Sequence, residues 1–67
     1  MTVLKELLVR QGRSIRGIAL TLGIDPALFN AYANGKRPNK RNAQRVASGL
    51  RVGVHELWHD FDNFRNW

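Results

Sequence analysis

The sequence has no cysteine, and only five of its 67 residues are acidic. Without cysteine the chain can form no disulfide and can offer no thiolate nucleophile. A single domain of this length buries only about 60% of its unfolded surface, so its core is small. We therefore expect stability to come from close packing between helices, with dimerisation as a second source.

Long hydrophobic runs are also lacking, since no apolar stretch exceeds a few residues. The sequence therefore predicts neither a membrane-spanning helix nor a signal-peptide core. Hydrophobic residues still make up 43% of the chain, which is ample for a folded protein. We expect one domain covering residues 1–67, in which residues 61–67 form a short aromatic tail or helix extension, and an intracellular location.

The shortage of acidic residues leaves a net charge of +6 that is unevenly distributed. Ten Lys and Arg precede position 56 against only Glu6 and Asp25, whereas the last twelve residues carry one Arg and three acidic residues. A basic body of this kind suits a polyanionic partner. We expect nucleic acid rather than a membrane, because no segment would be basic on one helical face and bulky and apolar on the other.

Helical periodicity and capping residues predict five helices. The first follows Thr2 as N-cap and closes at Gly12, and the second follows Ser14 and closes at Gly23. Their apolar positions recur at helical spacing. These positions are Val3, Leu4, Leu7 and Leu8 in the first helix, and Ile18, Ala19 and Leu22 in the second.

The third helix has the clearest start, because Asp25 can cap it and Pro26 occupies the first helical position. It ends at Asn34-Gly35, a fourth helix follows the turn at Pro38, and Gly53 precedes a fifth. No strand pattern or internal repeat competes, so the fold class is all-α. The inward positions are Leu28, Phe29 and Tyr32, then Ala43, Val46, Ala47 and Leu50, then Leu57, Trp58, Phe61 and Phe64, with Trp67 next in spacing.

The second and third helices are separated by about three residues. Small Ala19 lies four positions before Gly23, with apolar residues on either side, so two short helices can cross closely at a steep angle. This pattern predicts a helix-turn-helix. The segments LKEL, GRSIRGIALTLGI, ANGKRP and RVASGLRVGVHEL, in this order, resemble the lambda-repressor-like DNA-binding domains of the Cro and XRE type across almost the whole chain.

The resemblance implies a compact five-helix domain whose third helix enters the major groove while neighbouring loops contact phosphates. The family's base-reading positions correspond to Pro26, Ala27, and Asn30 or Ala31. Among these residues only Asn30 can make a directional hydrogen bond to a base edge. Ile15 stands where the family often has a Gln that touches the DNA backbone, and its side chain has no donor.

Three interpretations of this apolar third helix remain open. In the first, Ala27 and Ala31 contact thymine methyl groups, Asn30 or Asn34 contacts adenine, and DNA shape adds specificity. In the second, the surface is a docking site for another protein. In the third, small side chains only allow close approach of a backbone. The surface concerned comprises Ile15, Pro26, Ala27, Leu28 and Ala31.

Cations follow the third helix directly, where the resemblance places phosphate contacts. Four lie within six positions and are interleaved with asparagines, and backbone N–H groups at the fourth helix start would strengthen the grip. A second group, at the start of the second helix, could hold the opposite strand. The first group is Lys36, Arg37, Asn39, Lys40, Arg41 and Asn42, and the second is Arg13, Ser14 and Arg16. The alternative for both groups is a solvated charged surface.

The stretch HELWH, from His55 to His59, matches the H-E-x-x-H pattern of zinc peptidases. A catalytic zinc needs a third protein ligand, and the longer pattern fails because Asp62 stands where a Gly is required and Arg65 where the third His belongs. We therefore expect no metal centre, no cofactor and no enzymatic activity, and at most weak metal binding by two His at i, i+4. The fifth helix would instead place Leu57 in the core.

These observations lead to one expectation and one alternative. We expect a small transcriptional regulator, typical of a phage or mobile element, that binds operator DNA as a homodimer and occludes other proteins in the cytoplasm and nucleoid of a bacterial cell. The alternative is a protein-interaction module or antirepressor that binds another regulator through the apolar third-helix face. The aromatic residues nearest the C-terminus, Phe64 and Trp67, are the candidates for the dimer interface.

Overall fold

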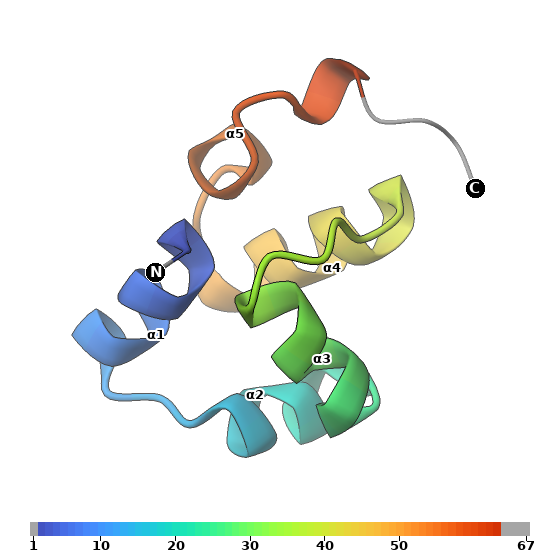
Figure 1. Ribbon diagram of the computed structural model, residues 1–67. Coiled ribbons are helices and arrows are strands. Elements are labelled where there is room, and N and C mark those ends of the chain that lie inside the picture. The colour runs from blue at the N-terminus through green and yellow to red at the C-terminus, as the bar shows by residue number, and fades with distance from the viewer. Residues whose placement is uncertain (1, 64–67) are drawn as a thin grey trace. The chain divides into compact units, whose positions relative to one another are not determined.

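Each helix of the computed structural model, which describes residues 2–63, begins and ends where local chemistry allows. In chain order these are α1 (Val3–Gln11), α2 (Ile15–Leu22), α3 (Pro26–Ala33), α4 (Lys40–Leu50), α5 (Val54–Leu57) and a 3₁₀ turn, η1 (Phe61–Asn63). Residues 2–63 contain no strand, which confirms the all-α class. The chain divides into two units, Met1–Arg37 with α1 to α3 and Pro38–Trp67 with the remaining elements (Figure 1).

The expected caps are confirmed in the first unit. Thr2 Oγ1 accepts a hydrogen bond from the Lys5 N–H at 3.0 Å, and Ser14 Oγ accepts one from the Gly17 N–H at 2.9 Å. Gly12 and Gly23 close their helices in the left-handed region, with φ of 67° and 72°. These side-chain and backbone contacts satisfy helix-end groups that would otherwise lack partners. The α1 and α2 boundaries therefore follow from short segments of sequence alone.

The core of the first unit comes from one face of each of its helices. Thr2 Oγ1 also donates to the Ala33 carbonyl at 2.6 Å, which ties the start of α1 to the end of α3. Leu22 and Leu28, which were expected inside, are only half-buried, and Val3 is 43% exposed. The buried apolar residues are Leu4, Leu8, Ile18, Ala19, Ile24, Phe29, Tyr32 and Ala33.

In the second unit, α4 presents the predicted apolar stripe. Asn39 Oδ1 caps the helix by accepting from the Asn42 N–H at 2.8 Å. At the other end Arg51 takes the left-handed conformation, with φ of 59°, a position where glycine is the usual residue. The buried stripe consists of Ala43, Val46, Ala47 and Leu50, as the spacing predicted.

The prediction of one continuous fifth helix through the aromatic residues is wrong. Helix α5 is a single turn that ends at Leu57, and Trp58 follows it with extended backbone at φ −132° and ψ 98°. Phe61 lies instead on η1, where it is 7% exposed and clusters with Ala43 of α4, against which Val54 and Trp58 also pack. The spacing of the aromatic residues mimics a helix, but burial of Phe61 beside α4 requires the chain to turn at Trp58.

Candidate nucleic-acid interface

Helix α3 has one buried and one exposed face, and the candidate base-contacting residues divide between exposed and half-buried positions. Phe29, Tyr32 and Ala33 are buried. The exposed row consists of Ala27, Asn30 and Asn34, which recur at helical spacing, and Pro26 and Ala31 beside it are half-buried. The row is narrow and carries two amide side chains and one methyl group, without any charge.

The turn before α3 fixes the direction of this row. The Ile24 N–H donates to the Ala19 carbonyl at 2.9 Å, across the left-handed Gly23, and the buried Ile24 side chain anchors the turn. Asp25 Oδ1 then accepts from the Ala27 N–H at 2.8 Å, which starts α3 immediately. Gly23 and Asp25 are exposed, but backbone hydrogen bonds back to α2, the buried Ile24 side chain and the Asp25 cap together fix the connection between α2 and α3. Figure 1 shows the pair joined by this short turn.

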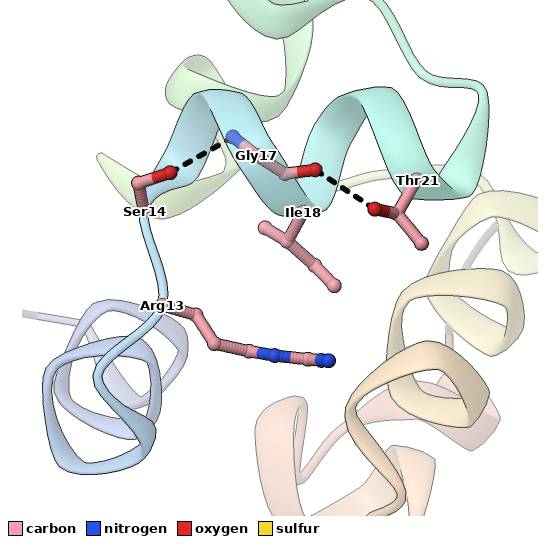
Figure 2. A pocket seen from close by; sticks show the side chains of 5 residues that line it. All are labelled: Arg13, Ser14, Gly17, Ile18 and Thr21. Carbon is pink, nitrogen blue, oxygen red and sulfur yellow. Dashed lines mark hydrogen bonds between the residues drawn. The ribbon is translucent and has the colours of Figure 1, made fainter.

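The start of α2 holds the predicted residues Arg13, Ser14 and Arg16, all exposed. Ser14 Oγ is committed to capping as an acceptor, although its O–H remains a donor group. Beside it lies an open hollow of about 250 Å³. Its lining comprises Arg13, Ser14, Gly17, Ile18 and Thr21, and Figure 2 shows the Arg13 and Ile18 side chains next to one another there.

Two residues of this hollow, Gly17 and Thr21, were not predicted as site residues from the sequence. A Cβ at position 17 would lie 2.7 Å from Ser14 Oγ, so the glycine leaves room for the capping hydroxyl. Thr21 Oγ1 donates back to the Gly17 carbonyl at 3.0 Å. The Ser14 cap itself was predicted, and a glycine three residues after a serine cap is the only sequence signal that could have indicated this contact.

The cations after α3 divide between the two units. Lys36 and Arg37 end the first unit and are exposed, and the Lys36 N–H donates to the Ala31 carbonyl at 2.9 Å after Gly35 at φ 115°. Asn39, Lys40 and Arg41 begin the second unit. The structure therefore brings Lys36 and Arg37 to the end of α3 and the other three residues to the start of α4.

At the start of α4, the side chains have unequal roles. Asn39 serves as the cap, and Arg41 is exposed. Lys40 is half-buried, and its Nζ lies 5.8 Å from the centre of the Phe61 ring, within the range of a cation–π contact. The first turn of α4 carries no acidic residue to offset its positive end. Sequence spacing indicated the cations but not the ring beneath one of them.

The HELWH residues do not share a helical face. His55 lies on α5, whereas His59 follows the end of that helix, so the i, i+4 pairing assumed for weak metal binding is wrong. His55 Nε2 instead lies 3.1 Å from Asp62 Oδ1, and its ring meets the Phe61 ring edge-on, with centroids 5.5 Å apart. Within residues 2–63 no three His, Cys, Asp or Glu side chains gather as metal ligands do.

The remaining predicted site residues, Phe64 and Trp67, lie outside the described residues, so the dimer interface stays a prediction. In the part of the chain that the structure describes, no helix is long and apolar enough to cross a membrane. Comparison of the chain with protein-family models, with curated proteins and with solved structures finds no match.

Proposed function

We propose that this protein is a sequence-specific DNA-binding regulator of the Cro and XRE type, which acts by occluding an operator. The observation that carries the proposal is the exposed row of Ala27 and Asn30 on α3 and Asn34 at its C-cap, which follows a hydrogen-bonded turn from α2. A short helix with small and amide side chains on its outer face can enter a major groove without a steric barrier. In this account α2 and α3 form a helix-turn-helix.

The chemistry of the row suits A·T-rich sequence. An asparagine amide can accept from adenine N6 and donate to adenine N7 at once, and a methyl group can pack against the thymine methyl. Exposed cations at both ends of the helix pair would hold phosphates, which supplies affinity rather than sequence preference. We assign base reading to Asn30 and Asn34 and phosphate contact to Arg16 and Lys36 of the first unit, all of them exposed. In the second unit we assign phosphate contact separately to the exposed Arg41 of α4.

A protein-docking module is the second candidate, and one observation favours it. Leu20 on α2 is 61% exposed, and α3 adds the half-buried Pro26, Leu28 and Ala31. Contiguous apolar patches that remain in solvent are typical of surfaces that bind other proteins. In that case the same helix pair would bind another regulator, and the cations would contribute little.

Fluorescence anisotropy at several salt concentrations tests the proposal. It measures binding of the protein to a duplex selected as its preferred sequence and to duplexes of random sequence. Asn30→Ala should cost about 1–3 kcal/mol on the selected duplex and little on random DNA, because it removes base contacts only. Arg41→Ala should weaken binding to both and lower the salt slope by about one unit, for one lost phosphate contact. Gln44→Ala, at an exposed neutral position of α4, is the matched control.

The opposite pattern supports the docking module. If Ala27→Glu abolishes capture of a protein partner while Arg41→Ala leaves it intact and DNA binding is weak with a shallow salt slope, the helix pair binds protein. Should Asn30→Ala leave the ratio of selected to random binding unchanged, the assignment of base reading to Asn30 is wrong. All three variants alter exposed positions, so the fold should persist, and far-UV circular dichroism checks this.

A further inference from the structure

The ring of Phe61 lies beneath the cation that opens α4, and nothing in core packing alone requires that pairing. Phe61 is 7% exposed and belongs to the cluster with Ala43, so the position of the ring is set by the packing of η1 on α4. Lys40, the first residue of α4, places its Nζ 5.8 Å from the ring centre. The His55 ring contacts the same ring edge-on, at an interplanar angle of 82°.

Lys40 lies in the first turn of α4, a position where a cation is unusual. Cations are disfavoured in the first turn of a helix, where the helix dipole is positive, and that turn holds Lys40 and Arg41 without an acidic residue. An unrestrained lysine there would swing its long side chain away from the helix start. Attraction between the ammonium and the π face of the Phe61 ring, 5.8 Å away, favours a side chain that stays near the helix start.

We propose that Phe61 is a positioning residue that holds the Lys40 ammonium ready for a DNA phosphate. This inference rests on the proposed function and extends it to a residue outside the helix pair. A lysine that binds phosphate normally loses side-chain freedom, which weakens binding. A lysine already ordered by a ring loses less. The ammonium has three donors, so a contact with the ring leaves N–H groups for a phosphate oxygen.

The test measures binding of a short random-sequence duplex by wild type, Phe61→Leu, Lys40→Ala and the double variant, at several salt concentrations. Phe61→Leu should weaken binding about two- to fivefold, the range expected for loss of one exposed cation–π contact. Its salt slope should stay unchanged, because the charge is still present. Lys40→Ala should lower the slope by about one unit. In the Lys40→Ala background, Phe61→Leu should have no further effect.

Folding and side-chain order are checked separately. Phe61→Tyr keeps the ring and should retain wild-type affinity. Gln44→Ala, on the exposed side of α4, should also leave the affinity for DNA unchanged. Thermal unfolding confirms that each variant is folded at the assay temperature. In NMR spectra of the DNA-free protein, ring-current shifts of the Lys40 ε-protons should be present in wild type and Phe61→Tyr and lost in Phe61→Leu.

Each contrary outcome has a distinct meaning. If Lys40→Ala weakens binding but Phe61→Leu does not, or if Phe61→Leu tightens binding, the positioning inference is overturned and DNA binding stands. If Phe61→Leu weakens binding equally with and without Lys40, the ring acts only through structure, and the inference is again overturned. If wild type shows no salt-dependent binding to any duplex, the proposed function and this inference fail together.

Discussion

At the scale of single residues, position 17 shows two helix preferences in conflict. Glycine inside a helix usually costs about 1 kcal/mol relative to alanine. Here the Gly17 N–H donates to Ser14 Oγ, and a Cβ would come within 2.7 Å of that oxygen. The glycine therefore preserves a cap that is itself worth about 0.5–2 kcal/mol. The glycine that lowers the helix propensity of α2 also leaves room for the Ser14 hydroxyl that caps the helix.

A double-mutant cycle on this pair gives the first prediction. Gly17→Ala in wild type should change the free energy of unfolding little, because the gain in helix propensity is offset by the displaced cap. In a Ser14→Ala background, where no hydroxyl needs the space, the same change should stabilise the protein by about 1 kcal/mol. Urea unfolding of the four proteins measures both values. Equal gains in the two backgrounds would show that the contact has no energetic role.

Arg51 provides a second prediction at this scale. It closes α4 with φ of 59°, a region that costs a non-glycine residue about 1–2 kcal/mol. Arg51→Gly relieves that strain but adds freedom to the unfolded chain, so we expect a net stabilisation of about 0.5–1 kcal/mol. Arg51→Ala keeps the strain and removes the charge, and should give no gain. A higher melting temperature for the alanine variant than for the glycine variant would contradict this account.

At the scale of secondary-structure elements, the length of α5 determines whether the HELWH stretch can have the helical geometry of a zinc peptidase. Glu56 accepts from the Gly53 N–H at 2.5 Å and starts the helix, but extended Trp58 ends it after one turn. A longer helix would have aligned His55 with His59. Because the helix stops between them, His55 is left to contact Asp62, with Nε2 and Oδ1 3.1 Å apart. The zinc-peptidase pattern therefore lacks the helical geometry on which it depends.

The third prediction follows from this geometry. Zinc that bound tightly to the folded protein would raise its melting temperature by mass action. We expect no such binding, so added zinc should leave the melting temperature nearly unchanged, and His59→Ala should behave as wild type. Differential scanning fluorimetry with and without zinc measures both. Stoichiometric zinc in the purified protein, or a stabilisation that His59→Ala removes, would show that the two His residues are ligands after all. Magnesium at the same concentration is the control for ionic strength.

At the scale of the whole molecule, the net charge and the small core bear on assembly. A domain of 67 residues has a small core, so burial of apolar surface between two copies would add to its stability. If the protein binds an operator as proposed, a dimer would match the two-fold symmetry that operator sites usually have. The predicted contacts, Phe64 and Trp67, lie beyond the described residues, and the assembly is therefore best tested in solution.

The fourth prediction is a homodimer that weakens when either aromatic residue is removed. Sedimentation velocity over a range of concentrations should show a monomer–dimer equilibrium for wild type, shifted toward monomer by Trp67→Ala and Phe64→Ala, because each removes apolar area from the interface. Val9→Ala, at a 70% exposed position of α1, should leave it unchanged. A wild-type monomer at high micromolar concentration, with and without duplex DNA, would rule out symmetric operator binding by this route.

Both ends of the first three helices, and most of the buried faces of the first four, could be predicted from the amino-acid sequence. Capping depends on residues within a few positions of one another, so Thr2, Asp25 and Gly23 carry the necessary information locally. The exposed Asn30 and the cations after α3 could be identified in the same way, because helical spacing assigns residues to faces. The assignment of DNA as their partner rests on chemistry and on resemblance, and it stays a prediction.

The positions of Trp58 and Phe61 depend on contacts between segments that are distant in sequence. Periodicity placed Trp58 and Phe61 on one continuous helix, because residues three positions apart lie on the same face of a helix. Burying Phe61 against Ala43 of α4 favours a chain that turns at Trp58, and that turn separates His55 from His59 and brings a ring under Lys40. Local propensity cannot encode such contacts, because the free energy that selects them comes from surfaces distant in sequence.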